Sequence, residues 1–256
     1  MIPDKWYEEP PSIEEIPKGF FVVIVDAAFK KGITGTAVVI KTKRKEYAPQ
    51  TYSARSRGPI HAELISIKKG LQRLRNIKKH VKGAIVYNDN LYANFFLKGI
   101  WTPRRKYIKE TVENIYDLIN ELGIKVEFIW IKGKHIRRVD RLAAKERRKE
   151  EERKEKQIQE RVMKIEERII RGRSVKICER DNKFFAISEK GDSLHCYEVS
   201  LDPPFCECQW WQKRWANKPE YIRKARALPC KHMCALAEYL GVDIFDIFEK
   251  QIWRVD

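Results

Sequence analysis

Four carboxylates in the first part of the chain stand beside expected element boundaries, and together they could hold divalent cations. Asp26 closes the first apolar stretch, and Asp89 follows the apolar run AIVYN. Glu63 and Asp140 each lie near the start of an expected helix. In a mixed sheet covered by helices, strand ends and helix starts can meet in one cleft. Carboxylates gathered there repel one another and are tolerated only with cations between them.

Carboxylate oxygens select hard cations such as Mg²⁺ or Mn²⁺. Two such ions about 4 Å apart would activate a water and stabilise the leaving oxygen of a phosphodiester, which is hydrolysis by in-line displacement. Taken singly, each acid also fits an ordinary local role. Asp89 fits a turn after a strand, and Glu63 and Asp140 suit the first turn of a helix because of its dipole.

A second cluster of metal-binding residue types lies in the last third of the chain, which holds all six cysteines. Cys206 and Cys208 form a C-x-C pair, and Cys230 and His232 form a C-x-H pair. Three thiolates and one imidazole make a closed tetrahedral shell for structural Zn²⁺. Cys234 could replace His232, although its place in an apolar helix start favours a core cysteine.

The remaining two cysteines, Cys178 and Cys196, lie inside expected strands and are interpreted as small buried hydrophobes. In a reducing compartment, clustered cysteines beside a histidine indicate a metal site before disulfides.

The elements that must position the four acids form one α/β domain. Five stretches have strand character, and Pro49 restricts the third of them to a sheet edge or a strand start. Three helices alternate with the later strands, and a further helix follows. We expect a mixed five-stranded sheet with flanking helices. The strand stretches are FFVVIVDAAF, TAVVIKTK, EYAPQTYSA, KGAIVYND and VEFIWIKG, and the helical ones are HAELISIKKGLQRLRN, NLYANFFLKG and YIKETVENIYDLINELG.

A long charged helix is expected to connect this domain to a second one. Between Arg141 and Arg171, acidic and basic residues alternate at spacings that allow ion pairs one turn apart. Ile158, Val162, Ile165 and Ile169 form an apolar stripe only in the second half, so the last turns should dock on the following domain. A coiled-coil dimer is an alternative, but two heptads are too few to favour it.

A small domain of short strands and a helix follows this connector. The whole chain is therefore divided into an N-terminal extension at 1–18, an α/β domain at 19–147, a helical connector at 148–172 and a zinc-binding domain at 173–256.

The overall charge indicates a polyanionic partner. The chain of 256 residues has a formal net charge of +17 and a pI near 9.6. Aromatic residues interleaved with the basic ones favour nucleic acid over a lipid surface, while a charged surface of the kind found in heat-adapted proteins is the alternative. We see neither a secretory signal nor an apolar run of the ~18 residues that a membrane span needs, so we expect an intracellular, cytoplasmic protein with no membrane contact.

The four acids lie within four short motifs that follow one another in a defined order along the chain. D-x-x-F in the first strand, AEL followed by GL in the first helix, NDN after the fourth strand and RVDRLA in the last helix resemble type 1 of the ribonuclease H family over about 19–147. The resemblance implies Asp26, Glu63, Asp89 and Asp140 as catalytic metal ligands and the RNA strand of an RNA–DNA hybrid as substrate. It also implies contacts to the DNA strand after the third acid, from Trp101, Arg104, Arg105 and Lys106.

This chain departs from the family pattern at three places. Ala27 follows the first acid where the family usually has glycine, and Gly58-Pro59-Ile60-His61 replaces the polar residues before the helix glutamate. His135 lies closer to Asp140 than the histidine of the flexible loop in many members. It is a candidate for product release or proton transfer, with a surface histidine as the alternative.

The cysteine pattern resembles the SWIM zinc finger, C-x-C-x(n)-C-x-H, over about 174–241. This implies zinc on Cys206, Cys208, Cys230 and His232 and a module that binds DNA or protein. Between the two ligand pairs, Trp210 and Trp211 are expected to pack over the C-x-C pair. The residues expected to contact nucleic acid there are Lys213, Arg214, Trp215 and Arg223.

The preferred hypothesis is an endoribonuclease that cleaves the RNA of RNA–DNA hybrids with two Mg²⁺ or Mn²⁺ ions, assisted by a structural zinc module. DNA or double-stranded RNA as substrate, a protein partner for the zinc module and the oligomeric state stay open. The alternatives are a non-catalytic nucleic-acid adaptor with a degenerate nuclease fold, and a transposase-like nuclease acting on DNA.

Overall fold

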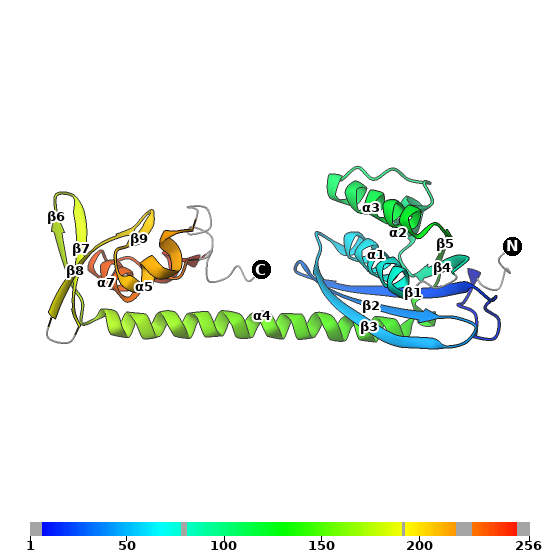
Figure 1. The fold of residues 1–256 in the computed structure, drawn as a ribbon, viewed down its shortest axis with the longest axis horizontal. Coiled ribbons are helices and arrows are strands. Elements are labelled where there is room, and N and C mark those ends of the chain that lie inside the picture. Colours follow the sequence, from blue (N-terminus) through cyan, green and yellow to red (C-terminus); the bar gives the residue numbers. More distant parts are fainter. Residues whose placement is uncertain (1–6, 78–80, 191–192, 219–226, 250–256) are drawn as a thin grey trace. The chain divides into compact units, whose positions relative to one another are not determined.

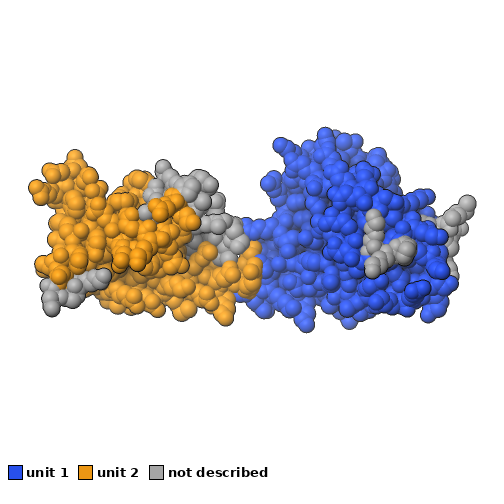
Figure 2. All heavy atoms as spheres, viewed as in Figure 1, with its two compact units in different colours: residues 1–152 blue, residues 153–256 orange. Residues whose placement is uncertain are grey.

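The structure is a computed structural model that describes residues 7–77, 81–190, 193–218 and 227–249. The chain forms two compact units, Met1–Glu152 and Arg153–Asp256, coloured separately in Figure 2. Each unit has its own hydrophobic core. Within the described ranges, no helix has both the length and the apolar character needed to cross a membrane.

Unit 1 is built on a mixed sheet in the order β3-β2-β1-β4-β5, which confirms the expected fold class (Figure 1). β1, β2 and β3 are antiparallel neighbours, while β4 pairs parallel to both β1 and β5. Pro49 lies in β3, an edge strand, where its missing N–H costs no interior ladder bond. The strands are β1 Phe20–Lys30, β2 Ile33–Lys41, β3 Glu46–Arg55, β4 Gly83–Asn88 and β5 Lys125–Trp130.

Helices cover both faces of this sheet. One core cluster joins α1 and α3 to the sheet through residues such as Leu64 and Leu71 on α1 and Ile115 on α3. The opposite face packs against Ile16 and against Val139 and Ala143 at the start of α4. Figure 1 shows α1, α2 and α3 on one side of the sheet. The helices are α1 Pro59–Ile77, α2 Leu91–Leu97, α3 Lys106–Leu122 and α4 Arg137–Gly172.

The strand pairing explains where Asp26 lies. The parallel pairing of β1 with β4 ends at Ile24 and Tyr87, whereas β1 continues beside β2 as far as Lys30. Asp26 is therefore inside β1 rather than at its end, which corrects the sequence prediction. It lies just past the carboxyl edge of the parallel strands, where a cleft can open. Glu63 is likewise one turn into α1 and not in its first turn.

A close backbone contact fixes α4 against the sheet. A Cβ atom on Gly35 of β2 would overlap the carbonyl oxygen of Ala143 and the backbone nitrogen of Arg147. Only glycine allows this approach of strand and helix. The contact lies in the same stretch of α4 that begins with Asp140.

Gly35→Ala should destabilise unit 1 by about 3 kcal/mol, because the added methyl group must push the backbone of α4 away from β2. Urea unfolding of the full chain, followed by tryptophan fluorescence, measures the change. Gly58→Ala is the matched control, since a Cβ there would meet nothing within 4 Å. Equal unfolding midpoints for the two variants would contradict the packing role of Gly35.

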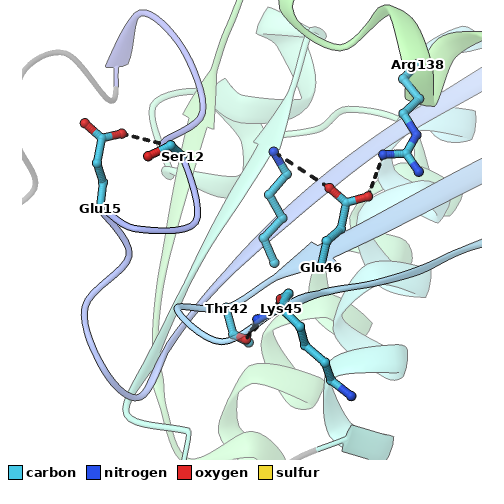
Figure 3. A network of polar contacts seen from close by, with 7 residues as sticks. Ser12, Glu15, Thr42, Lys45, Glu46 and Arg138 are labelled. Atoms are coloured by element: carbon cyan, nitrogen blue, oxygen red, sulfur yellow. Dashed lines mark hydrogen bonds and ion pairs between the residues drawn. The ribbon is translucent and has the colours of Figure 1, made fainter.

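Polar contacts also tie the start of α4 to the edge of the sheet (Figure 3). Glu46, the first residue of β3, forms ion pairs with Arg138 at 2.5 Å and with Lys41 at 4.0 Å. Further along α4, Glu146 accepts a hydrogen bond from the hydroxyl of Thr51 at 2.9 Å. These contacts help to hold the stretch of helix that carries Asp140.

Unit 2 contains a small antiparallel sheet in the order β6-β7-β8-β9. Its core joins this sheet to α7 and to Val162, Ile165 and Ile169 in the last turns of α4, as the apolar stripe predicted. The strands are β6 Lys176–Arg180, β7 Lys183–Lys190, β8 Ser193–Leu201 and β9 Pro204–Cys206. The helical elements after them are α5 Gln209–Trp211, the π-helical turn η3 Gln212–Ala216, α7 Lys231–Tyr239 and α8 Ile244–Ile247.

The strand register of this sheet corrects one prediction. Cys178 and Cys196 are exposed, not buried. Cys178 pairs with Phe185 and Cys196 with Ile187, whereas the buried Ala186 lies between these two partners on β7. Because neighbouring residues of a strand point to opposite faces, both cysteines lie on the face away from the core.

Candidate metal centres and nucleic-acid surface

Three of the four predicted acids come together in unit 1. Asp26, Glu63 and Asp89 can each offer an oxygen so that the three atoms lie within 4.8 Å of one another. Asp26 and Glu63 are buried, and Asp89 is half-buried. Asp140 is exposed and is not part of this group, but its charge raises the pKa of Asp26 and of Asp89.

The backbone at Asp89 is held by side chains that the sequence did not single out. The side-chain oxygen of Asn88 accepts hydrogen bonds from the N–H of Asn90 at 3.0 Å and from the amide of Asn94 at 2.8 Å. The indole N–H of Trp130 donates to the carbonyl of Asp89 at 2.9 Å. The side chain of Asn88 therefore makes the hydrogen bonds of this strand-end turn, a role that the sequence also allowed for Asp89.

The loop after β5 closes on the same acid. A Cβ atom on Gly133 would lie 2.8 Å from Oδ2 of Asp89. Gly133 begins the short helical turn η2, Gly133–His135, so His135 follows two residues after the close approach to Asp89. The His135 imidazole is half-buried, and its Nδ1 lies 3.7 Å from a carboxylate oxygen of Glu9.

Burial and mutual repulsion change the acidity of this cluster. Burial, with the charges of Asp89 and Asp140, raises the pKa of Asp26 from 3.8 to about 7. Burial and the charges of Asp26 and Asp89 hold the pKa of Glu63 well above its ordinary value. The cluster therefore holds protons more tightly than free carboxylates do unless a positive charge compensates it.

The donor set fits a divalent cation. Oε2 of Glu63 is buried and has no hydrogen-bond partner among the described residues. A buried carboxylate oxygen without a partner is costly, and a hard cation among three carboxylates would satisfy it.

Raised carboxyl pKa values predict a pH-dependent stability in magnesium-free buffer. Because the folded state keeps a proton on Asp26 that the unfolded state has lost, the free energy of unfolding should fall as pH rises between 3.8 and about 7. This contribution is fully present below the ordinary pKa. Chemical unfolding at several pH values measures it, and Asp26→Asn should remove this part of the slope. An identical slope in parent and variant would contradict the assignment.

A cavity beside the start of α1 collects aromatic and basic side chains. It has a volume of about 680 Å³, and its lining includes the predicted contacts Trp101, Arg104 and Arg105. The His61 and Tyr107 rings, 5.0 Å apart, border it as well. Lys106 does not line the cavity; it is exposed and pairs with Glu110 at 3.8 Å.

His61 and Arg57 were not predicted as members of this surface. The N–H of Arg57 donates to Nδ1 of His61 at 3.1 Å, and the Arg57 guanidinium lies over the Tyr107 ring at 5.1 Å. Burial and the nearby Arg57 charge lower the pKa of His61. The sequence feature that could have indicated them is Gly58-Pro59-Ile60-His61. This segment places the aromatic ring of His61 where the resemblance to the family leads one to expect polar residues.

In unit 2 the four predicted zinc ligands form one buried group. Cys206, Cys208, Cys230 and His232 each offer an atom within 4.8 Å of the others. Nδ1 of His232 lies 3.5 Å from the sulfur of Cys206 and 4.0 Å from that of Cys230. In a tetrahedral site with Zn–S of about 2.3 Å and Zn–N of about 2.0 Å, these atoms would be about 3.6 Å apart. The geometry therefore fits zinc.

The thiols of this group differ in acidity. Hydrogen bonds from Cys206 and Cys230 lower the pKa of Cys208, while burial raises the pKa of Cys230. Cys234 is buried in the core of unit 2 and is not a member of the four-residue group. Its position agrees with a core cysteine.

Ser188, on strand β7, contacts the zinc ligand His232. Its hydroxyl lies 3.1 Å from Nε2 of His232, the ring nitrogen that does not face the sulfurs. A hydrogen bond from Nε2 to this hydroxyl would fix the tautomer that leaves Nδ1 free to bind a metal. The sequence carried no signal for Ser188, since nothing in its spacing relates β7 to α7.

Ser188→Ala should weaken zinc binding about 10- to 100-fold, because the imidazole loses the partner that orients it. Competition with a chromogenic chelator measures the affinity of the full chain. Ser200→Ala, on β8 of the same sheet, is the control and should bind zinc like the parent. Equal affinity in all three proteins would show that Ser188 does not orient the ligand.

The tryptophans between the ligand pairs differ in exposure. Trp211 is fully buried, and Trp210 is half-buried against the core cluster that contains Trp211, Cys206 and Cys208. Trp215 is also half-buried, with its ring 6.4 Å from that of Trp211 and its indole nitrogen buried, so most of this ring is not free for a base. Lys213 and Arg214 are exposed. Arg223 lies outside the described residues.

Together these features define a two-unit protein with a carboxylate cluster in an α/β sheet and a closed cysteine–histidine centre. The SWIM zinc finger model matches residues 197–241. This match confirms the expected zinc finger in unit 2. No curated protein matches the chain.

Among solved structures, the chain is similar to several ribonucleases H1 over its N-terminal half. The enzyme of Halobacterium salinarum NRC-1 is 14% identical, with a TM-score of 0.45, covering 49% of this chain and 96% of that one. LC11-RNase H1 in complex with an RNA/DNA hybrid is 16% identical with a TM-score of 0.47, covering 50% and 97%. The N-terminal RNase H domain of rv2228c from Mycobacterium tuberculosis is 17% identical with a TM-score of 0.46, covering 51% and 94%.

Proposed function

We propose that the protein is a metal-dependent endoribonuclease that hydrolyses the RNA strand of RNA–DNA hybrids. The observation that carries the proposal is the convergence of Asp26, Glu63 and Asp89 within 4.8 Å, from three different parts of the sheet domain. Their order along the chain, with Asp140 after them, is the order of the ribonuclease H motifs. Asp140, exposed in the first turn of α4, is proposed as the fourth acid of the site.

The acids act by holding cations and the reacting groups in place. Bound Mg²⁺ or Mn²⁺ supplies a water of lowered pKa and stabilises charge on the leaving oxygen. Asp26 and Glu63, buried at the base of the cluster, restrict where a cation can bind. The contacts of Asn88 and Trp130 with the Asp89 turn keep the third carboxylate in position.

The remaining candidate side chains surround this cluster. His135 lies in the loop that closes on Asp89, where it could accept or donate a proton near the leaving group. The cavity lined by Trp101, Arg104 and Arg105 offers aromatic surface and positive charge to the uncleaved DNA strand.

The zinc finger is proposed to increase residence on the nucleic acid. Linking two binding modules makes the second contact intramolecular, so a weak module can raise the overall affinity. The high positive charge predicts that this affinity falls steeply with salt.

The test uses four labelled duplexes: RNA–DNA, DNA–DNA, RNA–RNA and a hybrid with a single ribonucleotide junction. The full chain is incubated with each, with and without Mg²⁺ or Mn²⁺. We expect metal-dependent cuts in the RNA of the RNA–DNA duplex. Cleavage without added metal, or of DNA alone, would overturn the proposal.

A non-catalytic nucleic-acid adaptor is the second candidate. The observations that favour it are Ala27, in the place where the family usually has glycine, and the absence of Asp140 from the close carboxylate group. This candidate predicts tight binding of the same duplexes with no cleavage under any metal. The duplex assay therefore separates the two functions.

A further inference from the structure

We propose that a cavity beside the zinc ligands is a binding site for a backbone phosphate of a nucleic-acid strand. The proposal deepens the role of the zinc finger and rests on the proposed binding of nucleic acid by this module. The cavity has a volume of about 360 Å³ and lies within unit 2. Four cationic side chains line it: Lys164, Arg168, Arg171 and Lys231.

Three of these cations come from one face of α4. Lys164, Arg168 and Arg171 are spaced by four and three residues, which places them on successive turns of the same helix face. Lys231 is the first residue of α7, so the cavity also borders the start of that helix. Free N–H groups at a helix start favour an anion.

Arg168 is the fixed element of the cavity. It is half-buried, its Nη1 donates to the carbonyl of Pro229 at 2.7 Å, and its guanidinium lies 4.4 Å from the ring centre of Trp210. Among the described residues, no further hydrogen bond engages this guanidinium. An arginine held in this way can offer its remaining N–H groups to a phosphate with little further loss of side-chain freedom.

The two lysines are available for a ligand. Lys164 is exposed and Lys231 half-buried, and neither forms an ion pair with a described residue. Arg171 pairs with Glu167 at 3.9 Å, and Glu189 is the other acid in the lining. The cavity therefore has four cations against two carboxylates.

Charge compensation of the zinc centre does not account for all these cations. Three thiolates and one Zn²⁺ leave a single negative charge on the centre. The four cations and two carboxylates of the lining give it a net charge of two positive charges. One positive charge therefore remains after the charge of the zinc centre is compensated. A phosphodiester, which carries one negative charge, matches this remainder.

A phosphate is favoured over a stacked base because Trp210 is already engaged. Arg168 lies over its ring at 4.4 Å and Arg214 at 5.7 Å. Arg214 is exposed and could add a second contact to the same strand. We therefore expect a strand to cross the cavity through its backbone, with little preference for sequence.

The test measures binding of a fluorescent single-stranded DNA to the full chain across salt concentrations in magnesium-free buffer. The double variant Lys164→Gln/Lys231→Gln should bind about tenfold more weakly, and its salt slope should fall by about 0.7, as expected for the loss of the one phosphate contact made in the cavity. The control Lys156→Gln/Lys176→Gln makes the same charge change at exposed sites of unit 2 outside the cavity. Zinc content is measured in each protein to show that the finger is intact.

Parent affinity and salt slope in the cavity variant, or an equal loss in the control, would overturn the proposal. Inorganic phosphate is titrated at matched ionic strength as a second probe, and tighter binding of it than of the DNA would reject the nucleic-acid assignment. Because DNA is the probe, this result is independent of hybrid cleavage. Failure of the nuclease proposal would appear only in the duplex assay.

Discussion

Asp26→Asn should reduce cleavage of an RNA–DNA hybrid about 10³-fold or more, since a lost metal ligand removes several kcal/mol of transition-state stabilisation. Asp26 is the buried acid whose pKa is raised by burial and by both Asp89 and Asp140, and its own charge raises the pKa of Glu63. Asparagine has nearly the same shape but no charge. The initial cleavage rate at saturating Mg²⁺ measures the effect.

A second property of the same variant separates catalysis from folding. Because the charged form of Asp26 is disfavoured by burial, Asp26→Asn should be at least as stable as the parent in magnesium-free buffer at a pH above about 7. It should also lose the stabilisation that Mg²⁺ gives the parent. Asp117→Asn, an exposed acid on α3, is the control and should leave both properties unchanged. Cleavage at the parent rate by the Asp26 variant would refute the metal-ligand role.

The sequence predicted the sheet because hydrophobic pattern and turn chemistry agree along unit 1. Runs such as FFVVIV and GAIVYN have no competing helical period, and Pro49 restricts its strand to an edge. The end of β1 could not be read in this way. Its apolar run stops at Asp26, but pairing with β2 continues to Lys30, and this depends on the partner strand.

The sequence predicts which acids belong to the site, but it does not predict the distances between them. Their order along the chain indicates one site, yet only the folded sheet brings Asp26, Glu63 and Asp89 within 4.8 Å and leaves Asp140 outside that group. The supporting contact of Ser188 with His232 joins elements far apart in the sequence. A single sequence contains no pattern that relates such partners.

The sequence does not determine which face of the small sheet in unit 2 each strand residue occupies. Cys178 and Cys196 were predicted to be buried because their neighbours are apolar, but a shift of one residue in a strand exchanges its two faces. Prediction of the zinc ligands does not depend on which face of a strand a residue occupies. Their spacing alone defines a tetrahedral donor set, and the fold need only bring two pairs together.

The carboxylate cluster and the zinc centre place different demands on the two units. Unit 1 keeps a large apolar core on both sheet faces, and its carboxylates act against stability until a cation binds. Unit 2 has a small sheet, and the sulfurs of Cys206, Cys208 and Cys230 are themselves part of its core. Zinc should therefore contribute to folding in unit 2, whereas Mg²⁺ should contribute mainly to function in unit 1.

Cys206→Ser should accordingly weaken zinc binding more than a hundredfold and unfold much of unit 2. Structural zinc supplies about 10–16 kcal/mol of apparent binding free energy, so one of four ligands accounts for about 3 kcal/mol. Serine has nearly the same shape as cysteine, but its hydroxyl is a poor zinc ligand. Zinc per chain and the rate of limited proteolysis within residues 153–256 measure the two effects.

The controls for this variant come from cysteines outside the four-residue group. Cys178→Ser, on the exposed face of β6, should retain zinc and resist proteolysis like the parent. Cys234→Ala should retain zinc as well, although removal of a buried sulfur should lower stability modestly, by about 1 kcal/mol. Full zinc content in the Cys206 variant, or zinc loss on replacing Cys234, would require a different ligand set. Because unit 1 has its own core, cleavage of the hybrid should persist in the Cys206 variant, with weaker substrate binding as its main defect.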